Sequence, residues 1–191
     1  MAVTKSANVM TEQANQLLIN FYNQGGQDSY GRQLDDILQW QEDLLETTHN
    51  YIQWLFPIIE ANAFHASTPL LNSTTIETFK QQASIQTNLL RSLNKMLAFY
   101  GLILNHSKSD QITIERSAEH FASASRRWLT PGNHNYLRFT RIIKSLCQLG
   151  LPHYAVALFD CLQVIFQEHS STIGLVTYQH WQQALNDNRN T

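Results

Sequence analysis

The sequence predicts an all-α protein, a single-domain helical bundle of about seven to nine helices. Apolar residues recur at spacings of three and four positions along most of the 191 residues, and no segment shows sustained two-residue alternation. The chain is also long enough to bury one core without metals or disulfides. We expect residues 1–10 to form a flexible N-terminal arm, residues 11–187 the helical domain, and residues 188–191 a tail.

Three helices are expected in the first third of the chain, where helix-breaking residues mark their ends. Residues 11–26 carry an apolar stripe that stops at a double glycine, and residues 32–40 repeat the same period. Residues 43–57 end at a proline, which cannot continue a helix. The connection over residues 57–73 is long but not very polar, so we expect it to lie over the core.

Six further helices are expected, each with apolar residues at helical spacing: 73–79, 84–104, 115–129, 134–149, 153–169 and 175–185. Thr74 and Glu77 fit a capping box at the start of the first of these. Gly150 and Pro152 follow the helix at 134–149, as expected for a helix end. The helix at 153–169 is apolar around most of its circumference, which places it at the centre of the bundle.

Composition excludes several classes of function. Charged residues make up only 15% of the chain, the net charge is −2 and the pI is about 6.4, which argues against a domain-wide nucleic-acid surface. Cys147 and Cys161 lack metal-ligand spacing and are interpreted as reduced core residues. The N-terminus has no apolar signal run, and no segment reaches the about 18 apolar residues that span a bilayer. We therefore expect a cytoplasmic location and no transmembrane segment.

The helix at 134–149 combines its apolar stripe with a line of basic side chains. With successive residues about 100° apart, Arg138 lies about 40° to one side of His134 and Arg141 about 20° to the other. Both arginines lean back toward the first helical turn, where unpaired N–H groups favour anions. This pattern predicts a site for a carboxylate or phosphate. The alternative is a structural ion pair with a carboxylate of the chain, for which Glu42, Asp43 and Glu46 are candidates.

Three stretches in a fixed order resemble the signature blocks of one family. They are "THNYIQWLFP" at 48–57, "MLAFYGLIL" at 96–104 and "NHNYLRFTRIIKSLCQLGLPHY" at 133–154. Together they resemble the opioid growth factor receptor domain, over about residues 20–165. The resemblance implies an all-helical domain and, as in animal members, binding of the pentapeptide Met-enkephalin, association with the nuclear envelope and restraint of cell proliferation. This chain has no basic nuclear-targeting run, and the family supplies no catalytic residues to transfer.

Several other residues have the chemistry of metal ligands, ligand-binding groups or catalysts. Glu46 and His49 have the spacing of a di-iron helix, but no second such pair follows, so we expect no metal and no cofactor. His49, Trp54 and Tyr100 are candidates for the apolar wall of a ligand site, although aromatic residues at helical spacing are usually core. No phosphate-binding glycine loop, nucleophile elbow or zinc-protease motif is present.

We therefore expect a non-enzymatic binding module for a short peptide or small anionic ligand. His134, Arg138 and Arg141 would hold the anionic end, and His49, Trp54 and Tyr100 the apolar part. One alternative is an enzyme that acts on a phosphorylated or carboxylated small molecule, with a histidine as acid–base group. A second is nucleic-acid binding through a local basic patch. Peripheral membrane association follows only by analogy with the family.

Overall fold

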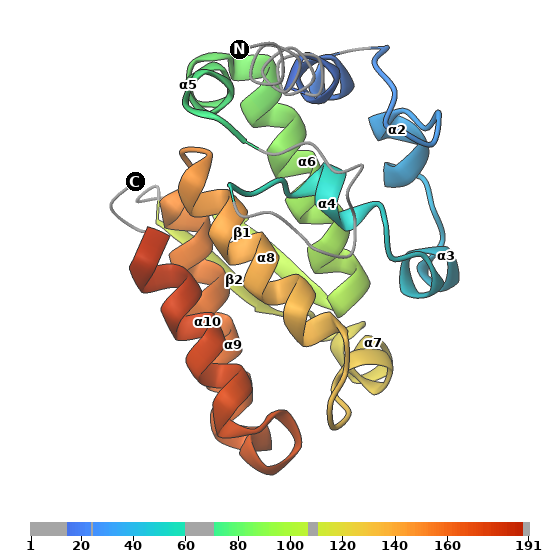
Figure 1. Ribbon diagram of the computed structural model, residues 1–191. Coiled ribbons are helices and arrows are strands. Elements are labelled where there is room, and N and C mark those ends of the chain that lie inside the picture. The colour runs from blue at the N-terminus through green and yellow to red at the C-terminus, as the bar shows by residue number, and fades with distance from the viewer. Residues whose placement is uncertain (1–14, 24, 60–70, 107–110, 189–191) are drawn as a thin grey trace, which may run out of the picture. The chain divides into compact units, whose positions relative to one another are not determined.

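The computed structural model describes residues 15–23, 25–59, 71–106 and 111–188 of the chain. These residues form two compact units, Met1–Ser92 and Leu93–Thr191, which are described separately below. The protein is predominantly helical, as predicted, but it also contains a two-stranded antiparallel sheet (Figure 1). The predicted all-α class is therefore corrected to a mainly helical protein that also contains a β-hairpin.

The first unit contains short helices and the beginning of a long one. Its elements are a helical segment at residues 15–22, α2 (Leu34–Leu38), α3 (Glu42–Thr47), α4 (Ile52–Leu55), α5 (Ser73–Gln81) and the start of α6 (Ala83–Tyr100). The single helix predicted at residues 43–57 is wrong, because Thr48 is extended and separates α3 from α4. Threonine, histidine and asparagine at 47–50 have low helix propensity, which explains the break.

Aromatic side chains form the core of this unit. Phe21 and Tyr22 on the first helical segment are buried, and the Phe21 ring meets the Trp54 ring edge-on at 5.4 Å. The Tyr22 hydroxyl donates to the carbonyl of Leu55 at the end of α4. Burial raises the pKa of the Tyr22 phenol, so this donor stays protonated. The hydrogen bond and the ring contact together tie α4 to the first helical segment.

The start of α5 differs from its prediction. Its N-cap is Asn72, two residues before the predicted Thr74, and the helix begins at Ser73. The Asn72 side-chain oxygen accepts hydrogen bonds from the backbone N–H and the hydroxyl of Thr75, at 2.8 and 2.9 Å. Asparagine caps helices at least as well as threonine, which explains why Asn72 takes this role.

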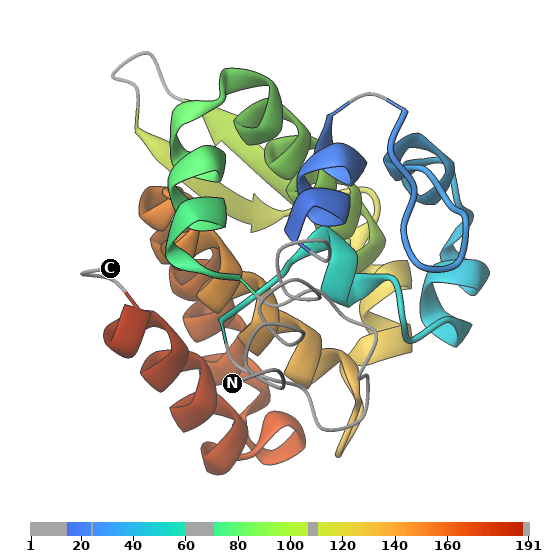
Figure 2. The ribbon, with the colours of Figure 1, turned by 45° about the horizontal axis from the view of Figure 1, so that its top comes forward.

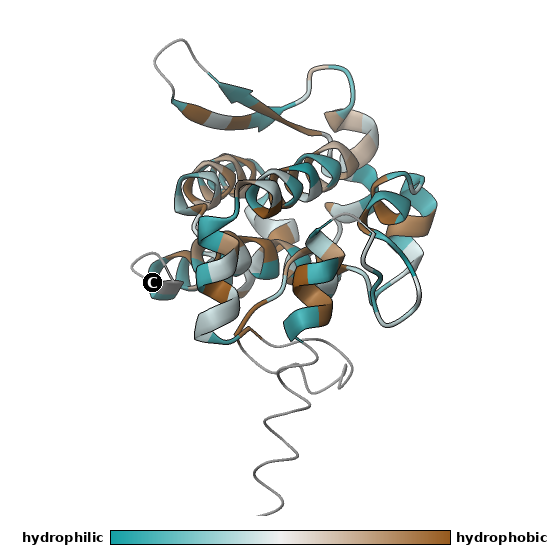
Figure 3. Cartoon of the chain, turned by 90° about the horizontal axis from the view of Figure 1, so that it is seen from above, coloured by the Kyte–Doolittle hydropathy of each residue, from teal (hydrophilic) through white to brown (hydrophobic). Residues whose placement is uncertain are grey.

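The second unit begins with the end of α6 and a β-hairpin. Strands β1 (Leu102–His106) and β2 (Ile112–Arg116) pair with Leu102 opposite Arg116 and His106 opposite Ile112 (Figure 2). The helix predicted over residues 84–104 was therefore wrong beyond Tyr100. Gly101, at a φ of 74°, ends α6 and turns the chain into β1. Both strands mix hydrophobic and hydrophilic residues (Figure 3).

Four helices complete the second unit: α7 (Phe121–Trp128), α8 (Asn135–Gln148), α9 (Pro152–Ile173) and α10 (Leu175–Asn188). The helix predicted at 115–129 starts later, because residues 112–116 belong to β2. Helices α8, α9 and α10 pack on one another, and α9 also packs against β2 (Figure 1). The central place predicted for the apolar helix at 153–169 agrees with this packing of α9.

Two tryptophans anchor the core of the second unit by hydrogen bonds. Trp128 Nε1 donates to the Tyr100 carbonyl at 3.1 Å, and Trp181 Nε1 donates to the Tyr136 carbonyl at 3.0 Å. Both indoles pack edge-on against Phe139, with ring centroids 5.2 and 5.8 Å away. Each buried indole thus satisfies its only polar group while its ring fills the core.

Some predictions concern residues outside the described ranges. These are the N-terminal arm at 1–10, the tail at 188–191 apart from its first residue, and most of the connection at 57–73. Cys147 and Cys161 are buried free thiols, as predicted. Among the described residues, no helix has both the length and the hydropathy needed to cross a bilayer.

Candidate functional site

Helix α8, which carries the predicted basic line, has well-defined ends. The Asn133 side-chain oxygen accepts from the backbone N–H of Asn135 at 2.9 Å, so an asparagine loop residue covers the first turn. At the other end the Leu151 N–H donates to the Leu146 carbonyl at 2.8 Å across Gly150, which has a φ of 89°. This pattern is a Schellman motif and confirms the predicted helix end at Gly150.

The three basic residues of the predicted line differ in depth. Arg138 is only 5% exposed, and its Nη1 donates to the side-chain oxygen of the fully buried Asn135 at 3.0 Å. The Asn135 amide in turn donates to Asn133 at 3.0 Å, which forms a buried polar chain along the start of α8. His134 and Arg141 are partly exposed, and both already interact with other groups of the chain.

The remaining predicted ligand residues fall in both units. Tyr100 is fully buried in the second unit, where its ring lies 4.1 Å from that of Phe139. Trp54 is 2% exposed in the core of the first unit, whereas His49 in the same unit is exposed and interacts within the chain. A shared ligand site for these residues stays a prediction. So does pairing of the α8 arginines with Glu42, Asp43 or Glu46, which belong to the first unit.

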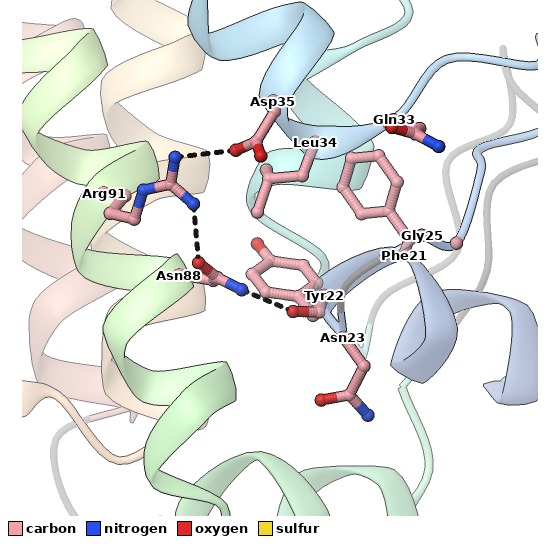
Figure 4. A pocket seen from close by; sticks show the side chains of 10 residues that line it. Phe21, Tyr22, Asn23, Gly25, Gln33, Leu34, Asp35, Asn88 and Arg91 are labelled. Carbon is pink, nitrogen blue, oxygen red and sulfur yellow. Dashed lines mark hydrogen bonds and ion pairs between the residues drawn. The ribbon is translucent and has the colours of Figure 1, made fainter.

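A polar hollow of about 310 Å³ lies within the first unit, and the sequence did not predict it. It is lined by the end of the first helical segment and the following turn, the start of α2, and one side of α6 (Figure 4): Phe21, Tyr22, Asn23, Gly25, Gly26, Gln33, Leu34, Asp35, Asn88 and Arg91. Arg91 and Asp35 face each other at its rim and form an ion pair at 2.6 Å.

Asn88 positions the guanidinium of this hollow. Its side-chain oxygen accepts from Arg91 Nη1 at 3.0 Å, and its side-chain nitrogen donates to the Tyr22 carbonyl at 2.6 Å (Figure 4). Asn88 therefore links α6 to the end of the first helical segment and holds Arg91 one helical turn further along. The Arg91 and Asp35 side chains remain 48% and 60% exposed, so both are open to a dissolved ligand.

The loop before α2 holds the other side of the hollow. The buried Asp28 carboxylate accepts from the backbone N–H groups of Tyr30 and Arg32 at 2.8 and 3.0 Å, and from Arg32 Nε at 2.6 Å. The Arg32 guanidinium also lies over the Tyr30 and Trp40 rings. This network fixes the turn that leads directly into Gln33 and Asp35 at the rim.

Chemically, the hollow offers one cation, one anion and several amides at short range. A ligand carboxylate can take two donors from the Arg91 guanidinium, and a ligand ammonium can bind the Asp35 carboxylate. Among the described residues, no group of three or more His, Cys, Asp or Glu side chains could hold a metal ion. The arrangement suits recognition of a small zwitterion.

The fold is that of a mainly helical domain, and the hollow is its candidate ligand site. The profile of the "Opioid growth factor receptor (OGFr) conserved region" matches residues 11–188, so the chain belongs to this family. No solved structure matches it.

Curated relatives carry the same family name. The mouse opioid growth factor receptor is 39% identical over 128 residues, and the human protein is 39% identical over 129 residues; each match covers 65% of this chain. The opioid growth factor receptor-like protein 1 of Xenopus tropicalis is 35% identical over 128 residues, again 65% of this chain. These matches cover only 19%, 18% and 24% of the respective relatives, so the chain spans about a fifth of their length.

Proposed function

We propose that this chain is a non-enzymatic binding module for short zwitterionic peptides, and that the hollow beside Arg91 is its binding site. The observation that carries the proposal is the accessible Arg91–Asp35 pair at the rim of a 310 Å³ hollow. A space of this size falls at the lower end of the about 300–1,000 Å³ range of small-ligand sites. It fits the end of a peptide, whose charged terminus would meet the pair.

The ion pair can open for a ligand at low cost. An exposed Arg–Asp pair contributes about 0–1 kcal/mol, because water solvates both partners well. A charge-assisted hydrogen bond to a ligand is worth about 1.5–3 kcal/mol in a partly desolvated site. A peptide carboxylate that displaces Asp35 from Arg91 is therefore bound favourably, because the released Asp35 carboxylate is 60% exposed and is solvated by water. Asn88 keeps the guanidinium in place during the exchange.

The relatives support the peptide class. They are named opioid growth factor receptors, and an opioid peptide has an ammonium and a carboxylate terminus of the kind that this hollow suits. Phe21, Tyr22 and Leu34, each at most 5% exposed, form the buried base of the hollow, so the surface beside the charged pair is mainly polar.

Calorimetric titration with Met-enkephalin tests the proposal. We expect the C-terminal amide of the peptide to bind about tenfold or more weakly than the free acid, since it loses a charge-assisted pair. Arg91→Gln should cause the same loss. Arg126→Gln, which removes an exposed arginine on α7, is the matched control and should change affinity less than about twofold.

Two outcomes would overturn the assignment of the hollow. If Arg91→Gln and Arg126→Gln bind the peptide with equal affinity, Arg91 is not part of the binding site. If Arg141→Ala abolishes binding while Arg91→Gln does not, the basic line on α8 holds the ligand instead. Unfolding midpoints of all three variants, measured by circular dichroism, show whether a lost affinity reflects a lost fold.

A further inference from the structure

A second hollow lies in the second unit, between strand β2 and helix α9. Its volume is about 260 Å³. Strand β2 contributes residues 112–115, Gln111 lies just before it, and the helix contributes residues at helical spacing: Ala157, Asp160, Cys161 and Val164. No residue of β1 lines it among those that the structure describes. We call this hollow the β2 groove.

The β2 groove follows the edge of the strand rather than one of its faces. Alternate side chains of a strand point to opposite faces, so four consecutive strand residues line one groove along an edge. One edge of β2 is paired with β1, and within the described part of the chain the sheet has no third strand. The groove therefore runs along the edge of β2 that faces away from β1, toward which alternate backbone N–H and C=O groups of the strand point.

Helix α9 supplies a floor of small side chains. Ala157 and Cys161 are one turn apart and only 6% and 7% exposed, while Val164 further along is 47% exposed. Burial raises the pKa of Cys161 to about 12, so the thiol stays neutral near pH 7. Ala157 and Cys161 thus form the closed base of the groove, and Val164 offers accessible apolar surface on which an aliphatic side chain of an added strand can pack.

The charges around the β2 groove have one sign. Glu115 and Asp160 are both exposed, and the described lining residues include no lysine or arginine. The neighbouring Arg116 does not offset them, because it binds both carboxylate oxygens of Glu168, at 2.6 and 2.9 Å. A chain with basic side chains would complement this rim.

We propose that the β2 groove binds an extended, lysine- or arginine-containing segment of a partner protein, which adds to the hairpin as a third strand next to β2. Backbone hydrogen bonds along the edge supply the pairing, in the manner of other β-augmentation sites. Aliphatic side chains on one face pack on Val164, and basic side chains meet Glu115 and Asp160. This site is independent of the hollow beside Arg91, because it uses different residues in the other unit.

Fluorescence anisotropy on the full chain tests the charge preference. The probe is a labelled, capped peptide of alternating valine and lysine, and a second peptide has glutamate in place of lysine. We expect the lysine peptide to bind at least about tenfold more tightly. The double variant with Glu115→Gln and Asp160→Asn should remove this difference. A matched double variant, Glu77→Gln with Asp187→Asn, changes the same number of exposed carboxylates elsewhere and should keep it.

Backbone methylation tests strand addition separately. Alternate N–H groups of a β-strand point to opposite edges, so the lysine peptide is methylated at alternate amides in each of the two possible phases. One phase places the methyl groups outward and should bind like the parent, and the other blocks the edge and should lose about tenfold or more. Equal binding of both phases would refute strand addition while leaving the charge preference intact.

Two further results would overturn the proposal. Absence of binding at millimolar peptide would show that the groove takes no such segment. A dimer in light scattering that disappears in an Ile112→Lys variant would show that a second copy of the chain covers this edge instead. Neither result bears on binding at Arg91, which is measured with a different peptide and different variants.

Discussion

The junction between α6 and β1 offers a sharp test of how close packing contributes to stability. Gly101 sits there with a φ of 74°, and its carbonyl accepts from the Ser117 N–H at 2.9 Å. A Cβ at this position would lie 2.7 Å from the Phe121 Cα and 2.9 Å from the Ala124 Cβ. Gly101→Ala therefore combines an unfavourable backbone conformation with a steric overlap against α7.

The expected loss of folding stability has two contributions, the backbone conformation and the steric overlap. A left-handed conformation costs an L-residue about 1–2 kcal/mol, and overpacking against fixed backbone costs about 1–3 kcal/mol more. Gly101→Ala should thus destabilise the protein by about 2–5 kcal/mol. Gly132→Ala is the matched control, because Gly132 has a φ of 68° and nothing within 4 Å of its would-be Cβ. It should cost about 1–2 kcal/mol, because the left-handed conformation is the unfavourable feature that it shares with Gly101→Ala.

Urea unfolding followed by circular dichroism and tryptophan fluorescence measures both variants. The prediction is a difference of at least about 1 kcal/mol between them at unchanged m-value. If the two variants lose the same stability within about 0.5 kcal/mol, the contact with α7 contributes nothing and the reasoning from close approach is refuted.

Two other predictions concern ion pairs of very different burial. Asp28→Ala leaves the largely buried Arg32 guanidinium without its carboxylate, so we expect the free energy of unfolding in urea to fall by about 3 kcal/mol. A decrease below about 1 kcal/mol would contradict a structural role for this ion pair. Hydrogen bonding to Arg116 lowers the pKa of the Glu168 carboxyl, so this pair stabilises the fold above the pKa of the unfolded glutamate and loses that contribution as pH falls through the lower folded pKa. Glu168→Gln should therefore be less stable than the wild type at neutral pH and equally stable at pH 2. If the stability difference between variant and wild type were the same at both pH values, the Arg116–Glu168 pair would not be its cause.

The long helices were predictable from the sequence because their signals are local. The apolar stripe of α8 and the glycine after it are contained within about sixteen residues, and the helix indeed ends in a glycine-based cap. The hairpin was missed because the apolar residues of β1 continue the stripe of α6 without a gap. The available signals were Gly101 and the alternation of isoleucine with polar residues in β2, and each is short enough to be overridden by the neighbouring helical pattern.

The candidate site was much less predictable than the fold. Arg91 and Asp35 are 56 positions apart, and no spacing rule connects residues at that separation. Sequence arithmetic did place His134, Arg138 and Arg141 on one line of α8, but it could not show that Arg138 is buried while the other two are partly exposed. The burial of a helix side chain depends on which other parts of the chain pack over it. A helical projection of the sequence does not contain that information.

The low charge of the chain affects the selectivity and the salt dependence of every proposed binding mode. With 15% charged residues and a net charge of −2, the long-range field is weak, so selectivity at both hollows must come from contacts at hydrogen-bond distance. One guanidinium or two carboxylates release few counterions, and affinity should fall by less than about tenfold between 50 and 200 mM salt. Nucleic-acid binding through many phosphates would instead lose about a thousandfold or more over the same range. The salt dependence of binding therefore separates short-range recognition at Arg91 or the β2 groove from a basic surface patch, whichever ligand is used.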